Sequence, residues 1–188
     1  MAVSKSHKRA EDLLIEGNRL MSAGNASGAE ARFRELIGLL PDFAEAHARL
    51  GLLLDQEGMP AEAERHYRQS ITIQPDQGEV LLNLGVLMAN RKQFEEAETC
   101  YRRALELIPV SAVAWTNLGV LQACRKQEKE AELSYRMALA IDPDHRLAYF
   151  NLSYLLLRQG RFEEGWRCFE KRDWYGQLEK NVPCPRWQ

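Results

Sequence analysis

The sequence predicts an all-α protein made of stacked two-helix hairpins, and three observations indicate this fold class. Proline recurs at intervals of 34 residues, at Pro41, Pro75, Pro109 and Pro143. Small and aromatic residues recur at fixed distances from these prolines. The apolar residues between the prolines follow helical spacing. A fixed period with helices inside it indicates a repeat protein whose units stack on one another.

Each repeat is numbered here in places, and place 1 is Ala10, Ala44, Gly78, Ala112 or Arg146. Place 8 is small in every repeat: Gly17, Gly51, Gly85, Gly119 and Ser153. Place 24 is always aromatic: Phe33, Tyr67, Tyr101, Tyr135 and Phe169. Small residues at places 8 and 20 let two helix backbones approach closely, and the aromatic ring fills the gap beside them. The proline at place 32 ends each second helix, because it cannot continue the hydrogen-bond pattern.

The third and fourth repeats resemble the tetratricopeptide repeat most closely, in VLLNLGVL with EEAETCYRRALELIP and in VAWTNLGVL with KEAELSYRMALAIDP. The resemblance covers residues 10–173 and implies five helix-turn-helix repeats in a right-handed superhelix. The repeats are expected at 10–43, 44–77, 78–111, 112–145 and 146–173. Residues 1–9 are expected to be an N-terminal extension, and residues 174–188 a tail or the start of a linker to a further domain.

The expected helices follow from this register. They span residues 10–23, 26–39, 44–57, 60–73, 78–91, 94–107, 112–125, 128–141, 146–159 and 162–173. On the outer side of the second helices, four Glu and Arg pairs recur with a spacing of four residues: Glu30–Arg34, Glu64–Arg68, Glu98–Arg102 and Glu132–Arg136. Such pairs stabilise a solvated helix surface by a few tenths of a kcal/mol (about 0.2–0.5 each) and do not indicate a site.

The first helix of each repeat has a packing face at places 4, 7, 8 and 11 and a second face at places 2, 5, 6, 9, 12 and 13. The two faces point in roughly opposite directions at about 100° per residue. The family resemblance implies that the second face lines a concave groove in which peptides lie. In the later repeats this face is apolar at Leu82, Val86, Val113, Val120, Leu147, Phe150 and Tyr154, with Asn90, Thr116 and Arg158 as polar candidates. The alternative is that some of these residues only pack one first helix against the next.

Place 6 is asparagine in three successive repeats, at Asn83, Asn117 and Asn151. An asparagine side chain both donates and accepts hydrogen bonds, so a regular row could hold an extended peptide backbone of any sequence. The row resembles the asparagine ladder in the repeat domain of O-linked N-acetylglucosamine transferase. The alternative is that asparagine is simply common at this place in the family. The row starts late, because repeats one and two have Ile15 and Arg49 there.

The sequence contains no pattern that supports catalysis, a cofactor or a metal. HExxH, GxSxG, a phosphate-binding glycine loop and paired cysteines are all missing from it. A net charge of −2 argues against nucleic acid as a partner, and no segment is apolar enough to enter a membrane. Place 2 carries an acidic row, Glu11, Glu45 and Glu79, which disfavours binding of a terminal carboxylate. The unpaired cysteines indicate reduced thiols and a cytoplasmic protein.

The fifth repeat departs from the pattern. Trp166 replaces the glutamate of place 21, and Trp174, Tyr175 and Trp187 follow. The run RQGRFEEGWRCFEKRDW followed by PCPRW resembles the junction at which bacterial repeats of this type precede a glycosyltransferase domain. The alternative is an intact small scaffold whose aromatic tail folds back over the last helix. The gene sequence beyond Gln188 distinguishes the two.

The leading functional hypothesis is a protein-interaction scaffold that binds a peptide or protein segment in its groove and is not itself an enzyme. The runner-up is the substrate-recruiting arm of a larger bacterial glycosyltransferase. A third hypothesis is self-assembly, in which the apolar C-terminal end of one copy forms a homo-oligomer with another.

Overall fold

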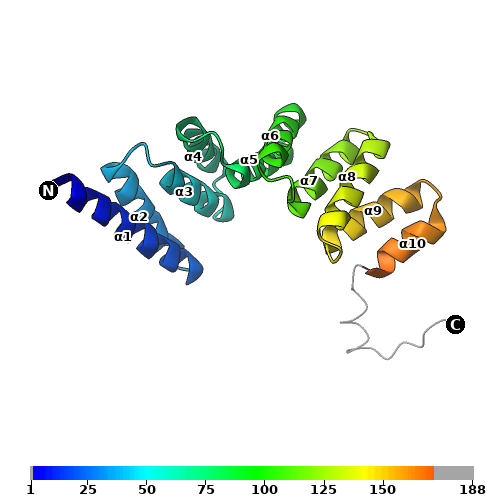
Figure 1. Cartoon of the computed structure of the whole chain (residues 1–188), viewed down its shortest axis with the longest axis horizontal. Coiled ribbons are helices and arrows are strands. Elements are labelled where there is room, and N and C mark those ends of the chain that lie inside the picture. The colour runs from blue at the N-terminus through cyan, green and yellow to red at the C-terminus, as the bar shows by residue number, and fades with distance from the viewer. Residues whose placement is uncertain (1, 172–188) are drawn as a thin grey trace, which may run out of the picture. The chain divides into compact units, whose positions relative to one another are not determined.

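The computed structural model describes residues 2–171, and the regular structure in this range is entirely helical (Figure 1). The helices form two compact units that divide between residues 107 and 108. The N-terminal unit contains α1 (Ala2–Ser22), α2 (Ala26–Leu39), α3 (Ala44–Gln56), α4 (Pro60–Ile73), α5 (Gly78–Asn90) and α6 (Phe94–Leu107). The C-terminal unit contains α7 (Ala112–Cys124), α8 (Glu128–Ile141), α9 (Arg146–Arg158) and α10 (Phe162–Lys171). Consecutive helices pair into antiparallel hairpins, as Figure 1 shows.

These bounds confirm the predicted helices to within one residue at each end, with one exception at the start of the chain; residues 172 and 173 of the last predicted helix lie outside the described residues. Helix α1 begins at Ala2, whereas the sequence led us to expect an extension before residue 10. The segment between Ala2 and Arg9 has no glycine or proline to stop a helix, so α1 continues through it. The predictions for Trp174, Tyr175, Trp187 and the rest of residues 174–188 lie outside the described residues.

The predicted contact between places 8 and 24 forms the centre of the first four hairpins. A Cβ added to Gly85 would lie 2.6 Å from Cε1 of Tyr101, and one added to Gly119 would lie 2.6 Å from Cε1 of Tyr135. No side chain fits between backbone and ring at that distance, which is why glycine is required there.

In the last hairpin the close approach of the two helices depends on a glycine of the second helix, α10, instead of the first helix. Ser153 is buried at place 8, and Gly165 occupies place 20. A Cβ on Gly165 would lie 2.8 Å from Cγ of Leu157. Helices α9 and α10 therefore make their close approach at a different point from the hairpins before them.

Place 15, between the two helices of each hairpin, has a left-handed backbone conformation. Gly24, Gly58 and Gly160 have φ values of 74°, 74° and 76°, while Lys92 and Lys126 adopt 61° and 60°. A residue with a Cβ pays a steric cost in this region that glycine does not. The two lysines are therefore strained positions that the repeat register did not predict.

We expect Lys126→Gly to raise the free energy of unfolding by about 0.5–1 kcal/mol, because relief of the strained φ outweighs the greater freedom of glycine in the unfolded chain. Chemical denaturation measures this change. The matched control is Lys129→Gly, three residues further on in the first turn of α8, which should destabilise the protein because glycine is a poor helix former. Destabilisation by both variants would contradict the strain at Lys126.

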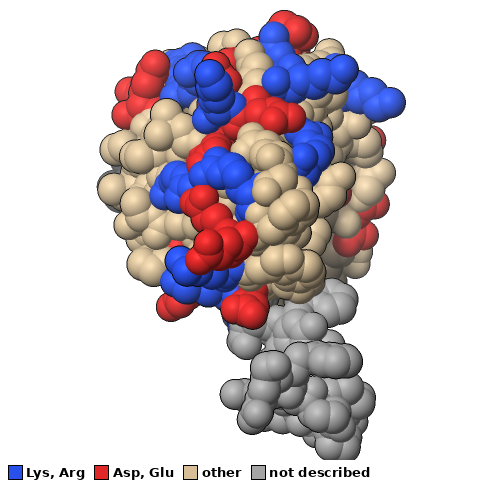
Figure 2. Space-filling model, turned by 90° about the vertical axis from the view of Figure 1, so that its right-hand side faces the viewer, with Lys and Arg blue, Asp and Glu red and all other residues tan. Residues whose placement is uncertain are grey.

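The four predicted Glu–Arg pairs are confirmed, with nitrogen–oxygen distances from 2.5 to 3.0 Å. Figure 2 shows acidic and basic side chains lying next to one another on the side of the molecule that it presents, rather than in separate patches of one sign. None of the described helices is both long enough and apolar enough to cross a membrane.

Candidate binding face on the first helices

In the C-terminal unit, the first helices α7 and α9 pack against each other and carry the predicted binding face. Places 2, 5, 6 and 9 fall within about a third of a turn of the helix, so they share one side of each helix. The apolar residues at these places are exposed: Val113 and Val120 on α7, and Leu147, Phe150 and Tyr154 on α9. We call these five residues, with Asn117 and Asn151, the α7–α9 face.

Asn117 and Asn151 occupy the same place on the two neighbouring helices, and both are half-buried. Each amide therefore lies on the same side of its helix as the exposed apolar residues, at the edge of that side. Asn83 has the same place on α5, which belongs to the N-terminal unit.

Two other residues of the C-terminal unit that were predicted to bind a peptide, Thr116 and Arg158, already have partners within the chain. Thr116 is only 2% exposed, and its hydroxyl donates a 2.8 Å hydrogen bond to the Ala112 carbonyl oxygen. Because its own helix satisfies the hydroxyl, Thr116 is buried without a solvent contact, and its predicted place on the open face is wrong. Arg158 is exposed, but its guanidinium is paired with Glu128 at 2.5 Å.

The N-terminal unit presents a more polar version of the same places. On α5, Leu82, Asn83 and Val86 are half-buried, and Asn90 is exposed. The acidic row at place 2 is exposed along the unit at Glu11, Glu45 and Glu79. Among these first helices, α7 and α9 therefore each carry two or more large exposed apolar residues on this face, whereas α5 offers little apolar surface and α1 has Ile15 alone, at 67% exposure.

Two histidines far apart in the sequence meet inside the second hairpin. His47 of α3 lies against His66 of α4 with 2.9 Å between their Nδ1 atoms, and the rings are stacked. Nε2 of His47 lies 3.0 Å from the Pro41 carbonyl oxygen. A carbonyl only accepts, so His47 carries its proton on Nε2 and accepts at Nδ1 from His66. Trp115 occupies the equivalent place and donates in the same way to Pro109.

His47 is at place 4, on the predicted packing face, and it is only 7% exposed; its contact with His66 was not predicted. Burial is the main cause that lowers the pKa of His66, to about 4, and the neighbouring His47 lowers it further. Arg65 and Arg34 act in the same direction, while Glu62 opposes them. The folded structure therefore stabilises the pair with both imidazole rings neutral.

We expect the protein to lose stability below neutral pH because of this pair. The folded pKa of His66 is below its ordinary value of 6.5, so the stabilisation is complete above about pH 6.5 and is lost as the pH falls towards 4. Since His66 is half exposed to solvent, we expect a loss of about 1 kcal/mol in the free energy of unfolding between about pH 7.5 and about pH 5. Denaturation curves at the two pH values measure it. His66→Gln can still donate to His47 but does not titrate, so it should show a smaller difference; an equal difference would count against the pair.

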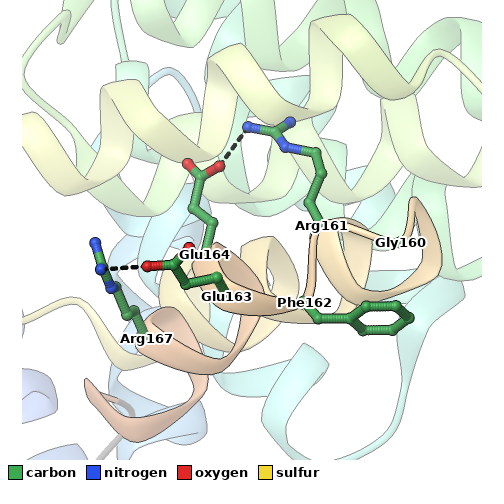
Figure 3. A pocket seen from close by; sticks show the side chains of 6 residues that line it. All are labelled: Gly160, Arg161, Phe162, Glu163, Glu164 and Arg167. Atoms are coloured by element: carbon green, nitrogen blue, oxygen red, sulfur yellow. Dashed lines mark hydrogen bonds and ion pairs between the residues drawn. The ribbon is translucent and has the colours of Figure 1, made fainter.

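A shallow depression of about 570 Å³ lies at the start of α10 and is shown in Figure 3. Arg161 pairs there with Glu164 at 2.5 Å, and Arg167 pairs with Glu163 at 2.6 Å. The Phe162 ring points away from these charged groups (Figure 3). Because the charged groups satisfy one another, the depression is a solvated surface with no arrangement for chemistry. Within residues 2–171, no group of three or more His, Cys, Asp or Glu side chains is placed to hold a metal.

Solved structures similar to this chain are helical repeat proteins. MamA has 21% identity and a TM-score of 0.76, and the match covers 89% of this chain and 97% of that chain. PilF of Pseudomonas aeruginosa has 20% identity and a TM-score of 0.81, with 89% and 77% covered. YrrB, described as a tetratricopeptide-repeat protein with an unusual peptide-binding site, has 20% identity and a TM-score of 0.74, with 91% and 88% covered. At these identities the likeness concerns the fold alone.

Among curated proteins, no sequence matches this chain. Two family models do match, and both are described as tetratricopeptide repeat. One matches residues 16–78 and the other residues 76–144, so together they cover more than half of the chain. With ten described helices paired into hairpins of this register, the chain belongs to the tetratricopeptide-repeat proteins.

Proposed function

We propose that the C-terminal unit binds a segment of another protein on the α7–α9 face. Proteins of this family generally act as scaffolds for protein partners. The observation that carries the proposal is the row of exposed apolar side chains on two neighbouring first helices. Tyr154 is 66% exposed and Leu147 is 63% exposed, on the face opposite to the helix packing. Contiguous apolar surface of this kind on a folded protein commonly marks an interaction site.

The chemistry of the face indicates what kind of segment it suits. Apolar side chains of a partner would bury the exposed surface of Val120, Phe150 and Tyr154, which supplies affinity. The amides of Asn117 and Asn151 can each donate and accept, so they suit the main chain of an extended segment. The seven residues of the α7–α9 face are uncharged, so contacts to them need no charge on the partner. We expect roughly micromolar affinity, because a mobile peptide is ordered on binding.

Selection from a displayed random peptide library tests the proposal with a matched pair of variants. Leu147 on α9 and Leu133 on the second helix α8 are 63% and 62% exposed, so they differ in place but not in exposure. Leu147→Ser should weaken a selected peptide about tenfold, because it removes apolar area from the contact, while Leu133→Ser should leave affinity unchanged. Equal affinity of both variants, measured by fluorescence anisotropy, would contradict the proposal.

The peptide-binding site described for YrrB gives this proposal a precedent within the fold. We take the chain itself to be non-catalytic. The alternative, a substrate-recruiting arm of a glycosyltransferase, depends only on the likeness of the sequence after Arg158 to such junctions, and it stays a prediction. In that case the same α7–α9 face would hold the protein substrate.

A further inference from the structure

Ion pairs at fixed places of the repeat join neighbouring hairpins within each unit. The arginine at place 25 pairs with the glutamate at place 19 of the next hairpin in three cases: Arg34–Glu62, Arg68–Glu96 and Arg136–Glu164. The glutamate at place 21 pairs with an arginine of the next hairpin in two cases: Glu64–Arg91 and Glu132–Arg161. Places 21 and 25 of a second helix therefore face the next hairpin, and place 19 faces the hairpin before it.

The last hairpin has different residues at the two forward-facing places. Helix α10 carries Trp166 at place 21 and Glu170 at place 25, where the earlier hairpins have glutamate and arginine. The Trp166 ring is 53% exposed and lies edge-on to Phe169 with 5.1 Å between ring centroids. This end thus offers a large aromatic ring and an acid instead of the ion-pairing residues.

The first hairpin differs in a complementary way at the places that receive these contacts. Arg91 and Arg161 occupy places 14 and 16 of their repeats, and the first repeat has Ala23 and Asn25 there. At place 19, where the later repeats have glutamate, it has Gly28. These residues are small and uncharged, so they leave room for a ring and do not repel Glu170.

We infer that the protein self-associates head to tail, with α10 of one copy docked on the first hairpin of a second copy. The bulky Trp166 would lie over the small residues Ala23 and Asn25, and Glu170 would lie over Gly28. Both ends depart from the ion-pairing pattern, and each departure fits the other in size and charge, which is why we assign a second copy as the occupant. Because the two surfaces differ, each dimer keeps one unoccupied surface of each kind, so further copies can be added to form a chain. The inference does not depend on the α7–α9 face.

Sedimentation velocity of the full chain over a micromolar to submillimolar concentration series tests the inference. We expect the mean mass to rise with concentration. Trp166→Glu should weaken association roughly tenfold, since it places a charge where the ring would be buried by the second copy. Leu133→Ser is the control, because Leu133 is also exposed, at 62% against 53% for Trp166, but lies on α8 rather than on α10 or the first hairpin, and it should associate like the unmodified chain.

Charges of opposite sign introduced at position 28 test whether this residue lies near Glu170 of a second copy. Gly28→Glu should weaken association and Gly28→Arg should strengthen it, each about threefold, because the new side chain faces Glu170. Either Cβ displaces the Asn25 side chain to the same extent. An acid in the first turn stabilises helix α2 and a base does not, so an effect on folding would have the opposite sign.

Mixing two variants distinguishes head-to-tail association from other arrangements. Trp166→Glu keeps an intact head and Gly28→Glu keeps an intact tail, so an equimolar mixture should form dimers that do not grow further. A monomer at every concentration would overturn the inference. Equal association of the Gly28→Glu and Gly28→Arg variants would also overturn the inference, since it would indicate contact between the α10 helices of two copies.

Discussion

Replacement of Tyr135 with alanine is expected to lower the free energy of unfolding by about 3–5 kcal/mol. The ring is 2% exposed and lies against the backbone at Gly119, so alanine would leave a cavity that the rigid helices cannot close. Burial also raises the pKa of its hydroxyl well above the ordinary range. Denaturation monitored by far-ultraviolet circular dichroism measures the loss.

Tyr154→Ala is the control for this prediction, because it removes the same side chain from the same unit at a place that is 66% exposed. It should change the free energy of unfolding by no more than about 0.5 kcal/mol. A similar loss for Tyr135→Ala and Tyr154→Ala would mean that place 24 does not hold the hairpin together.

The double variant Asn117→Ala, Asn151→Ala is expected to weaken a peptide selected on the unmodified chain at least several-fold, which corresponds to about 1–2 kcal/mol. Each substitution removes a donor and an acceptor from the α7–α9 face. Fluorescence anisotropy with the labelled peptide measures the affinity, and the unfolding midpoint should stay unchanged because both side chains are only half-buried.

A second double variant, Asn117→Asp with Asn151→Asp, separates the two roles of the amide. Aspartate keeps the acceptors and loses the donors, so its effect reports how much the donated hydrogen bonds contribute. Unchanged affinity in the alanine variant would remove the asparagine row from the proposal, even if the apolar residues around it do bind.

Much of the fold could be predicted from the sequence because its signals are local. A proline at place 32 ends a helix wherever the repeat occurs, and glycine at place 8 reports a close approach that no other residue allows. The departure at α1 has the same local origin, since the absence of a stop signal before residue 10 is visible in the sequence. The strained Lys126 was missed because lysine itself does not indicate a left-handed conformation, although glycine at place 15 of three other repeats does.

The candidate site could be predicted only in part, because exposure depends on neighbouring helices. Phe150 and Thr116 share place 5, yet the ring is exposed and the hydroxyl is buried. The contact between His47 and His66 depends on how α3 pairs with α4. That both histidines belong to one repeat does not by itself show that their side chains meet. The contacts between hairpins were missed for the same reason, since Arg68 was assigned only its partner four residues earlier.

The contacts that join one hairpin to the next include exposed charges, whereas the contacts inside a hairpin bury rings against backbone. Screening by added electrolyte acts on the first kind and hardly on the second. In the nearest-neighbour description of repeat arrays, a high ionic strength would thus reduce the coupling between neighbouring hairpins of one unit while the intrinsic stability of each hairpin stays the same. Cooperativity of unfolding, more than its midpoint, would then depend on the ionic composition of the solution.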